Sequence, residues 1–330
     1  MTLLTVENLR LQFKTDEGLI TAVDDVSFSL DPGEVMGLVG ESGSGKSVTA
    51  KSIMKLNPGN AVYQPGSRIL LELDGRTVDV MALKRANDMK IVRGGAVSMI
   101  FQEPMASFAP AITIGDQMVE QLLLHKKIDK KEAVRISVEM LERVGISDAS
   151  KRFKQYAFEL SGGMRQRAMI AMALSTRPKL LIADEPTTAL DVTIQAQVID
   201  LMKDLVTDFG MGIIFITHDL GVIAQTADKV AVMYLGRMVE QGPVREVIRE
   251  PIHPYTKGLL NALPRLDDLD APLTPVPGDI PSPLERPEGC VFHTRCALAD
   301  PRCKAVPEMQ AFTPVHHAAC TVMQEDRVKA

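Results

Sequence analysis

Two glycine-rich turns, each followed by residues that favour a helix, constrain the fold of this chain more than any other feature. The first is Gly40-Glu41-Ser42-Gly43-Ser44-Gly45-Lys46-Ser47, and the second is Leu160-Ser161-Gly162-Gly163-Met164. The N-terminus of a helix exposes backbone N–H groups and the positive end of the helix dipole, so each turn can hold a phosphate. Only the first turn carries a lysine. We therefore predict that the second turn completes a nucleotide site on another molecule.

The first turn has the spacing of a phosphate-binding loop and lies between an expected strand, 34–39, and an expected helix, 47–56. In such a loop the backbone amides surround the phosphates, Lys46 reaches the β and γ groups, and the Ser47 hydroxyl binds magnesium. A flexible Gly/Ser turn is the alternative, and the two flanking elements disfavour it. The sequence therefore predicts a site for ATP and Mg²⁺.

The hydrophobic pattern predicts an α/β fold. Alternating apolar residues before Leu30 predict antiparallel strands, and apolar runs at 97–101, 180–183 and 213–217 predict buried strands. Helical spacing predicts helices at 133–144 and 194–205, which end at Gly145 and Gly210. Strands that alternate with helices indicate a mostly parallel sheet with helices on both faces. Residues of about 104–160 predict a small helical insertion.

Composition excludes several classes of protein. Hydrophobic residues make up 45% of the 330 residues, which is ample for a packed core. The net charge of −5 provides no basic field for nucleic acid. The first residues show no basic segment followed by an apolar one, and the longest apolar runs are strand-sized. We expect a cytosolic chain whose membrane role, if any, comes through a partner.

Polar residues suited to nucleotide chemistry follow three of the expected strands. Asp184 and Glu185 follow the strand 180–183, where a carboxylate can bind magnesium and a second can polarise the attacking water. Gln102 can contact magnesium or water, and His218 can hydrogen-bond a γ-phosphate. Such residues are more often structural when they occur alone, so these assignments depend on the phosphate-binding loop.

Together these residues resemble the ATP-binding cassette (ABC) ATPases from about Leu3 to Gln241. The matching segments are Gly40–Ser47 for the Walker A motif, Gln102 for the Q-loop, Leu160–Met164 for the signature, Asp184 and Glu185 for the Walker B aspartate and catalytic glutamate, Ala189–Asp191 for the D-loop, and His218 for the switch histidine. Met164 stands where glutamine is commonest. The resemblance also implies that Phe13 stacks on adenine.

The resemblance implies a P-loop NTPase fold with a RecA-like parallel sheet core, an antiparallel β subdomain and the helical insertion. It implies active hydrolysis, because no key catalytic residue is replaced. It also implies that the signature of one subunit (Ser161, Gly162 and Gly163) closes over ATP bound to the Walker A motif of the other, and that Asp191 of the D-loop is a nucleotide-binding residue. This agrees with the inference from the two turns.

All four cysteines lie beyond residue 289, in the spacing C-x5-C-x6-C-x16-C: Cys290, Cys296, Cys303 and Cys320. In a reducing compartment such a group more often binds metal than forms disulfides. The spacing differs from the usual pairs of structural zinc sites and from common ferredoxin patterns. Zinc, an iron–sulfur cluster or neither remain open, with His293, His316 and His317 as substitute zinc ligands.

Three further segments resemble the ATP-binding subunits of dipeptide and oligopeptide importers: Gln102–Phe108, His253–Pro264 and Gly289–Cys296 with the later cysteines. The resemblance then covers nearly the whole chain and implies a 4Fe–4S cluster held by the four cysteines. We predict an ATPase domain at 1–263 and, at 264–330, a proline-rich linker with the cysteine extension. Residues 104–110, with Met105 and Phe108, are predicted to form an apolar groove for a membrane-spanning partner.

The leading hypothesis is an ATPase subunit that energises import of di- or oligopeptides from the cytoplasmic face of the bacterial inner membrane. Its expected partners are a second ATPase subunit, as a heterodimer before a homodimer, two membrane-spanning permease subunits, and an extracytoplasmic binding protein. An importer of a nickel complex, an opine or an oligosaccharide is the alternative, because the solute binds other subunits. A soluble ABC ATPase without a transport role and a metal-sensing regulator are two further classes.

Overall fold

The computed structural model describes residues 2–103, 107–186, 192–263 and 275–324. Contacts between residues divide the chain into two compact units, which we describe separately. The first unit comprises mainly residues 72–214, and the second comprises mainly residues 4–30, 35–71 and 215–330. The second unit is discontinuous in the sequence because early strands pair with later ones, as β3 does with β10.

The second unit begins with an antiparallel sheet. Strand β1 (Leu4–Thr15) pairs with β2 (Gly18–Leu30), with β4 (Ala61–Tyr63) and with β5 (Arg68–Leu73). Alternate side chains of these strands, such as Val26, Phe28 and Leu30, are buried, as expected for a sheet with one covered face. The antiparallel strands predicted before Leu30 are confirmed.

A second sheet in this unit carries the phosphate-binding loop. Strand β3 (Val35–Val39) is buried at every residue and runs parallel to β10 (Lys229–Tyr234), which pairs antiparallel with β11 (Arg237–Pro243). Helix α1 (Lys46–Ile53) follows the loop. It is shorter than the predicted helix 47–56, because the backbone at Lys55 turns into the left-handed region with φ 49°.

The C-terminal region of the chain continues this sheet. Strand β13 (His317–Ala318) pairs with β11, and β12 (Gln310–Ala311) pairs with β13. A buried hydrogen bond of 2.7 Å joins His316 Nε2 to Glu240 Oε1. The remaining elements of this unit are β9 (Gly212–Thr217, which begins in the first unit), α9 (Leu220–Thr226), α10 (Val244–Arg249), α11 (Pro254–Asn261), and the 3-10 turns η3 (Pro283–Glu285), η4 (His293–Arg295) and η5 (Pro301–Lys304).

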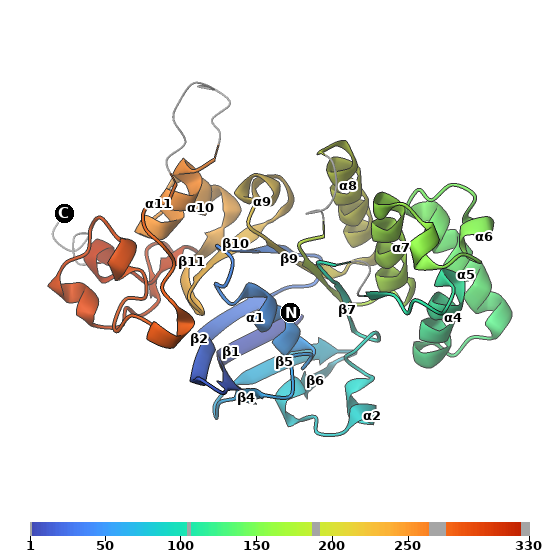
Figure 1. Ribbon diagram of the computed structural model, residues 1–330, viewed down its shortest axis with the longest axis horizontal. Coiled ribbons are helices and arrows are strands. Elements are labelled where there is room, and N and C mark those ends of the chain that lie inside the picture. Colours follow the sequence, from blue (N-terminus) through green and yellow to red (C-terminus); the bar gives the residue numbers. More distant parts are fainter. Residues whose placement is uncertain (1, 104–106, 187–191, 264–274, 325–330) are drawn as a thin grey trace. The chain divides into compact units, whose positions relative to one another are not determined.

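The first unit combines parallel strands with a helical bundle. Its elements are β6 (Arg76–Asp79), η1 (Val80–Ala82), α2 (Ala86–Met89), β7 (Val97–Ile100), α4 (Ile114–His125), α5 (Lys130–Arg143), α6 (Ala149–Arg152), η2 (Ala157–Glu159), α7 (Gly162–Ser175), β8 (Leu180–Asp184) and α8 (Val192–Phe209). Strands β7 and β8 pair in parallel and are buried along their lengths. Figure 1 shows α4, α5 and α7 side by side.

Glycines end two of these helices where the sequence predicted. Gly145 follows α5 with φ 75°, and its N–H donates to the Glu142 carbonyl at 2.9 Å. Gly210 follows α8 with φ 60°. A residue without Cβ adopts this left-handed conformation at little cost. No helix among the described residues is long and apolar enough to cross a membrane.

The fold contains a buried histidine that links stability to pH. His253 begins α11, where its Nδ1 accepts a hydrogen bond from the Tyr255 N–H at 3.1 Å, while the His253 backbone N–H donates to Glu240 Oε2. Only 1% of His253 is exposed. Burial lowers the pKa of its imidazole from 6.5 to about 4, against the nearby Glu240 charge, which raises it.

We predict that stability falls as the pH drops from 6.5 towards 4. In this window the unfolded chain binds a proton at His253 that the folded chain does not, whereas above pH 6.5 the imidazole is neutral in both states. His253→Asn keeps a helix cap without a titrating group. Its stability relative to wild type should rise by about 3 kcal/mol between pH 7 and pH 4. Urea unfolding of both proteins measures this difference, and parallel pH profiles would contradict the prediction.

Candidate nucleotide-binding site

The phosphate-binding loop lies between β3 and α1, and two of its glycines are required by close backbone contacts. A Cβ atom at Gly40, where φ is 148°, would lie 2.2 Å from the Met233 carbonyl oxygen. A Cβ atom at Gly45, where φ is 99°, would lie 2.6 Å from the Ala22 carbonyl oxygen. The loop backbone therefore packs directly on β10 and β2, and larger residues would displace it.

The polar groups of this loop suit an anion. Lys46 is 6% exposed, and its Nζ donates to the carbonyl oxygens of Gly40 and Glu41 at 2.8 and 2.9 Å. Helix α1 has no acidic residue in its first turn and no side-chain cap at Gly45. The positive end of the helix dipole is therefore not offset by the helix's own side chains, which favours a bound phosphate.

A second group of predicted site residues lies in the first unit, at the end of β8. Asp184 is buried, and the next residue, Glu185, has a left-handed backbone with φ 46°. This conformation costs a non-glycine residue on the order of 1–2 kcal/mol, so neighbouring contacts must hold it. Gln102 Nε2 donates to Glu185 Oε2 at 2.9 Å, so the structure brings these two predicted residues together.

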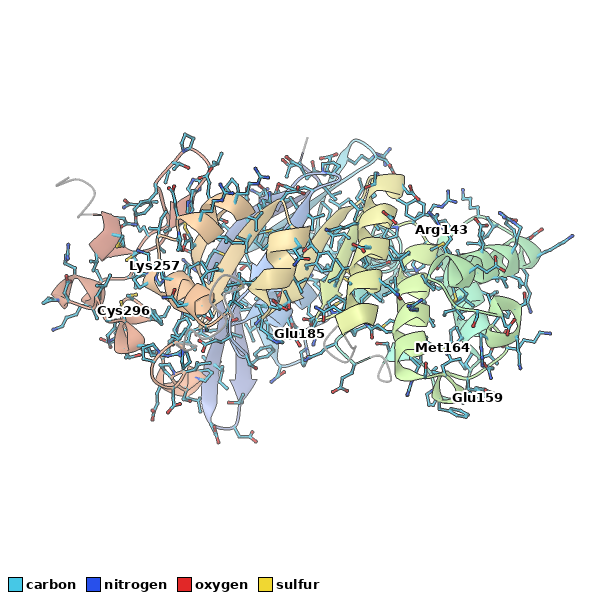
Figure 2. The ribbon with its side chains drawn as sticks, turned by 90° about the horizontal axis from the view of Figure 1, so that it is seen from above. Arg143, Glu159, Met164, Glu185, Lys257 and Cys296 are labelled. Atoms are coloured by element: carbon cyan, nitrogen blue, oxygen red, sulfur yellow. The ribbon has the colours of Figure 1, made fainter. Side chains whose placement is uncertain are left out.

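Sequence analysis missed Gln166 in this group. Gln166 is 3% exposed on α7, and its Nε2 donates to the Pro186 carbonyl oxygen. This contact holds Pro186, the residue after Glu185, and Glu185 is labelled in Figure 2. The signal in the sequence is a glutamine on the apolar face of the expected helix, where a buried amide needs a partner.

The second glycine-rich turn forms the N-terminus of α7. The Ser161 hydroxyl accepts a hydrogen bond from the Met164 N–H at 3.3 Å, so Ser161 caps the helix. Ser161 and Gly162 are exposed, and a Cβ atom at Gly162 would meet open space. The first turn of α7 contains no acidic residue. This helix end is therefore accessible to an anion from solution or from another molecule.

The structure places the other predicted residues as follows. His218 is exposed between β9 and α9, next to Asp219, which caps α9. Phe13 is half-buried in β1, opposite Ile20 and Ala61. Asp191 of the expected D-loop and Met105 of the expected groove lie outside the described residues. Phe108, from the same expected groove, is 5% exposed and belongs to the core.

The four cysteines of the C-terminal region gather without disulfides. Cys303 and Cys320 form a buried cluster with Val322, and Cys290 packs against it. Burial raises the pKa of the Cys290 thiol to about 11, and the other three cysteines raise it further. Figure 2 marks Cys296, whose thiol pKa is also raised by burial.

The histidines near the cysteines make other contacts. The His293 ring nitrogen Nδ1 lies 2.8 Å from the Cys290 carbonyl oxygen, and His316 bonds to Glu240. Within the part of the chain that the structure describes, no group of three His, Cys, Asp or Glu side chains has the arrangement of a metal site. The structure therefore shows a gathered set of thiols rather than formed metal-ligand geometry.

The parallel pairing of β3 with β10, the glycine-rich loop after β3 and the carboxylates at the end of β8 define an α/β nucleotide-binding protein of the P-loop class. Comparison with known families is more specific. The ABC transporter family matches residues 23–188, and the C-terminal region of oligopeptide/dipeptide transporters matches residues 239–303. The chain belongs to the ABC transporter family of ATP-binding proteins, and it is an ATPase.

Similar proteins cover almost the entire chain. A Brucella abortus protein described as a peptide import ATP-binding protein is 50% identical, over 98% of each chain. The oligopeptide transport ATP-binding protein OppD of Salmonella typhimurium is 49% identical, over 96% of this chain and 93% of OppD. The dimeric ATP-binding cassette MJ0796 has a TM-score of 0.65 at 23% identity, over 74% of this chain and 99% of its own. The last similarity confirms the predicted fold.

We predict that the cap at Ser161 stabilises the first unit. Ser161→Ala removes the acceptor for the Met164 N–H and should cost about 1 kcal/mol of unfolding free energy, while Ser161→Asn should retain most of it. Urea unfolding measures both variants. Thr113→Ala, which removes the corresponding cap of α4, is the matched control. If Thr113→Ala destabilises the protein and Ser161→Ala does not, the Ser161 hydroxyl is not a cap.

Proposed function

We propose that this chain is the ATP-hydrolysing subunit of an importer for dipeptides and oligopeptides. The observation that carries the proposal is the match of residues 239–303 to the C-terminal region of oligopeptide/dipeptide transporters, together with relatives near 50% identity that are named for peptide transport. The cassette alone does not distinguish solutes, whereas this C-terminal region is specific to a subset of transporters.

The proposed nucleotide site uses both groups of residues. Residues Gly40–Ser47 hold the phosphates, with Lys46 at the β and γ groups, and Phe13 stacks on adenine. Ser47, Gln102 and Asp184 bind Mg²⁺, which neutralises charge on the phosphates. Glu185 is the general base for the attacking water, and His218 contacts the γ-phosphate. The hydrogen bond from Gln102 to Glu185 supports this assignment, because it orients the carboxylate.

The proposed active state contains two ATPase subunits. Ser161, Gly162, Gly163 and Asp191 of each subunit complete the nucleotide site of the other, and the exposed N-terminus of α7 supports this arrangement. We favour a heterodimer with a second ATPase subunit. This heterodimer binds two permease subunits at the cytoplasmic face of the inner membrane. The permease subunits receive the peptide from an extracytoplasmic binding protein.

We predict that Glu185→Gln lowers the rate of Mg²⁺-dependent ATP hydrolysis by about 10²- to 10⁴-fold without preventing ATP binding, because it removes the base but keeps the shape. Phosphate release by the co-purified importer measures the rate. Glu139→Gln, on the exposed surface of α5, is the control and should retain wild-type activity.

The same variant tests the pairing of subunits. Glu185→Gln should retain ATP through gel filtration of the importer, and adding Ser161→Arg should release it, since the arginine fills the open space before α7. Equal hydrolysis by wild type and Glu185→Gln would refute the catalytic assignment. Retained ATP in the double variant would refute the shared site.

We further propose that Cys290, Cys296, Cys303 and Cys320 hold a 4Fe–4S cluster. The donor chemistry supports this, because four thiols are gathered and iron binds thiolates. Burial makes uncompensated thiolates unfavourable, and a cationic metal centre would offset this cost. The role we assign to the cluster is to hold together the turns η4 and η5.

We predict that protein purified anaerobically contains about four iron and four sulfide per chain, and that Cys296→Ser loses both. Elemental analysis and acid-labile sulfide measure the content. His317→Ala is the control and should keep the cluster, because no histidine is needed as a ligand. Zinc without sulfide would show that the four cysteines form a zinc site instead.

A further inference from the structure

A buried arginine of the C-terminal region contacts the phosphate-binding loop. The Arg295 side chain is 4% exposed, and its Nη1 and Nη2 atoms donate to the two carboxylate oxygens of Glu41 at 2.7 and 3.2 Å. The two residues are 254 positions apart in the sequence. Such a paired contact is among the stronger and more directional side-chain interactions in proteins.

The guanidinium of Arg295 is fixed on its other sides as well. Its Nε donates to the Pro277 carbonyl at 2.9 Å, Nη2 donates to the Val276 carbonyl at 3.2 Å, and Nη1 donates to the Tyr234 hydroxyl at 3.3 Å. These contacts come from the C-terminal region and from β10. Arg295 is therefore held in the conformation that reaches Glu41, and little side-chain entropy remains to be lost.

A second side chain holds Glu41 through its backbone. The Glu41 N–H donates to the Tyr255 hydroxyl at 2.8 Å. Tyr255 is fully buried, and its ring packs against Tyr234 and Phe292 with centroids 4.7 and 5.3 Å apart. Phe292 lies three residues before Arg295, so the same C-terminal segment supports both contacts to Glu41.

The charge of Glu41 gives these contacts a functional consequence. Glu41 places a carboxylate inside a loop that holds a polyphosphate, and like charges at short range repel. Arg295 supplies the cation that offsets this carboxylate, and burial limits the screening of the pair by salt. Lys46 bonds to the Glu41 carbonyl but is needed at the phosphates, so Arg295 and Tyr255 are the contacts that do not compete with nucleotide.

We propose that Arg295 is a positioning residue for ATP binding: it fixes and neutralises Glu41, so that the C-terminal region sets the affinity of the phosphate-binding loop. The proposal rests on the proposed assignment of Gly40–Ser47 as the nucleotide loop, and it does not depend on a cluster at the cysteines.

The test compares ATP affinity of full-length variants by isothermal titration calorimetry with MgATP. Arg295→Met should raise the Kd about tenfold, because the Glu41 carboxylate loses its counter-charge. Glu41→Gln in the Arg295→Met background should restore the Kd to within about threefold of wild type, because the repelling charge is gone. Arg302→Met is the matched control: Arg302 also precedes a cysteine, but it pairs with Asp300 in its own turn, and its loss should leave the Kd unchanged.

The restoration by Glu41→Gln separates positioning from a structural role. A merely structural arginine would leave the double variant as weak as Arg295→Met, and that result, or an unchanged Kd in Arg295→Met, would overturn the proposal. If circular dichroism shows that Arg295→Met does not fold, the variants Arg295→Lys and Tyr255→Phe are tested instead. Each should raise the Kd about threefold, because each removes part of the hold on Glu41, and wild-type affinity in both would overturn the proposal.

One further variant distinguishes failure of this proposal from failure of the nucleotide site. Lys46→Met should abolish ATP binding if Gly40–Ser47 is the loop that holds the phosphates. If Lys46→Met binds ATP as wild type does, the loop assignment is wrong and the role of Arg295 falls with it. If Lys46→Met loses binding while Arg295→Met does not, only the role of Arg295 is refuted.

Discussion

The contact of loop backbone with strand backbone at Gly40 and Gly45 is the constraint on which the nucleotide site depends. At both positions a Cβ atom would lie within 2.6 Å of a carbonyl oxygen of a neighbouring strand, at Met233 or Ala22. The loop backbone therefore lies directly against these strands, and the Lys46 side chain adds hydrogen bonds to the Gly40 and Glu41 carbonyls. Helix α1 begins without a side-chain cap or an acidic residue in its first turn, which leaves its dipole available to a phosphate.

Features encoded by neighbouring residues could be predicted from the sequence. The buried strand β3, the glycine-rich loop and the helix after it are specified within about twenty residues. The glycines after α5 and α8 predict the left-handed backbone that ends each helix. Helix α1 ends before the predicted residue 56, because Lys55 adopts a left-handed conformation that non-glycine residues rarely take. The pattern of apolar and polar residues near Lys55 does not predict this left-handed conformation.

Contacts between residues far apart in the sequence could not be predicted. The hydrogen bond from Gln102 to Glu185 was consistent with the expected chemistry, but the buried Gln166 that fixes the following residue was not foreseen. The pairing of β13 with β11 and the contact of Arg295 with Glu41 join the C-terminal region to earlier segments of the same unit. Such long-range contacts depend on the tertiary fold. An arginine before a cysteine does not by itself indicate which carboxylate its guanidinium will contact.

The position of Glu41 explains how a C-terminal region can act on a loop whose function lies in its backbone. In the proposed site, main-chain amides, Lys46 and Ser47 hold the phosphates, so the side chain at position 41 is not required for these contacts. By the role proposed for Arg295, a carboxylate there costs affinity unless a cation offsets it, and this cation comes from the C-terminal region. Any rearrangement that withdraws Arg295 therefore acts twice on the loop, through the lost hydrogen bonds and through the uncovered charge. An apolar contact in the same place would fix the loop, but its loss would not uncover a charge beside the phosphates.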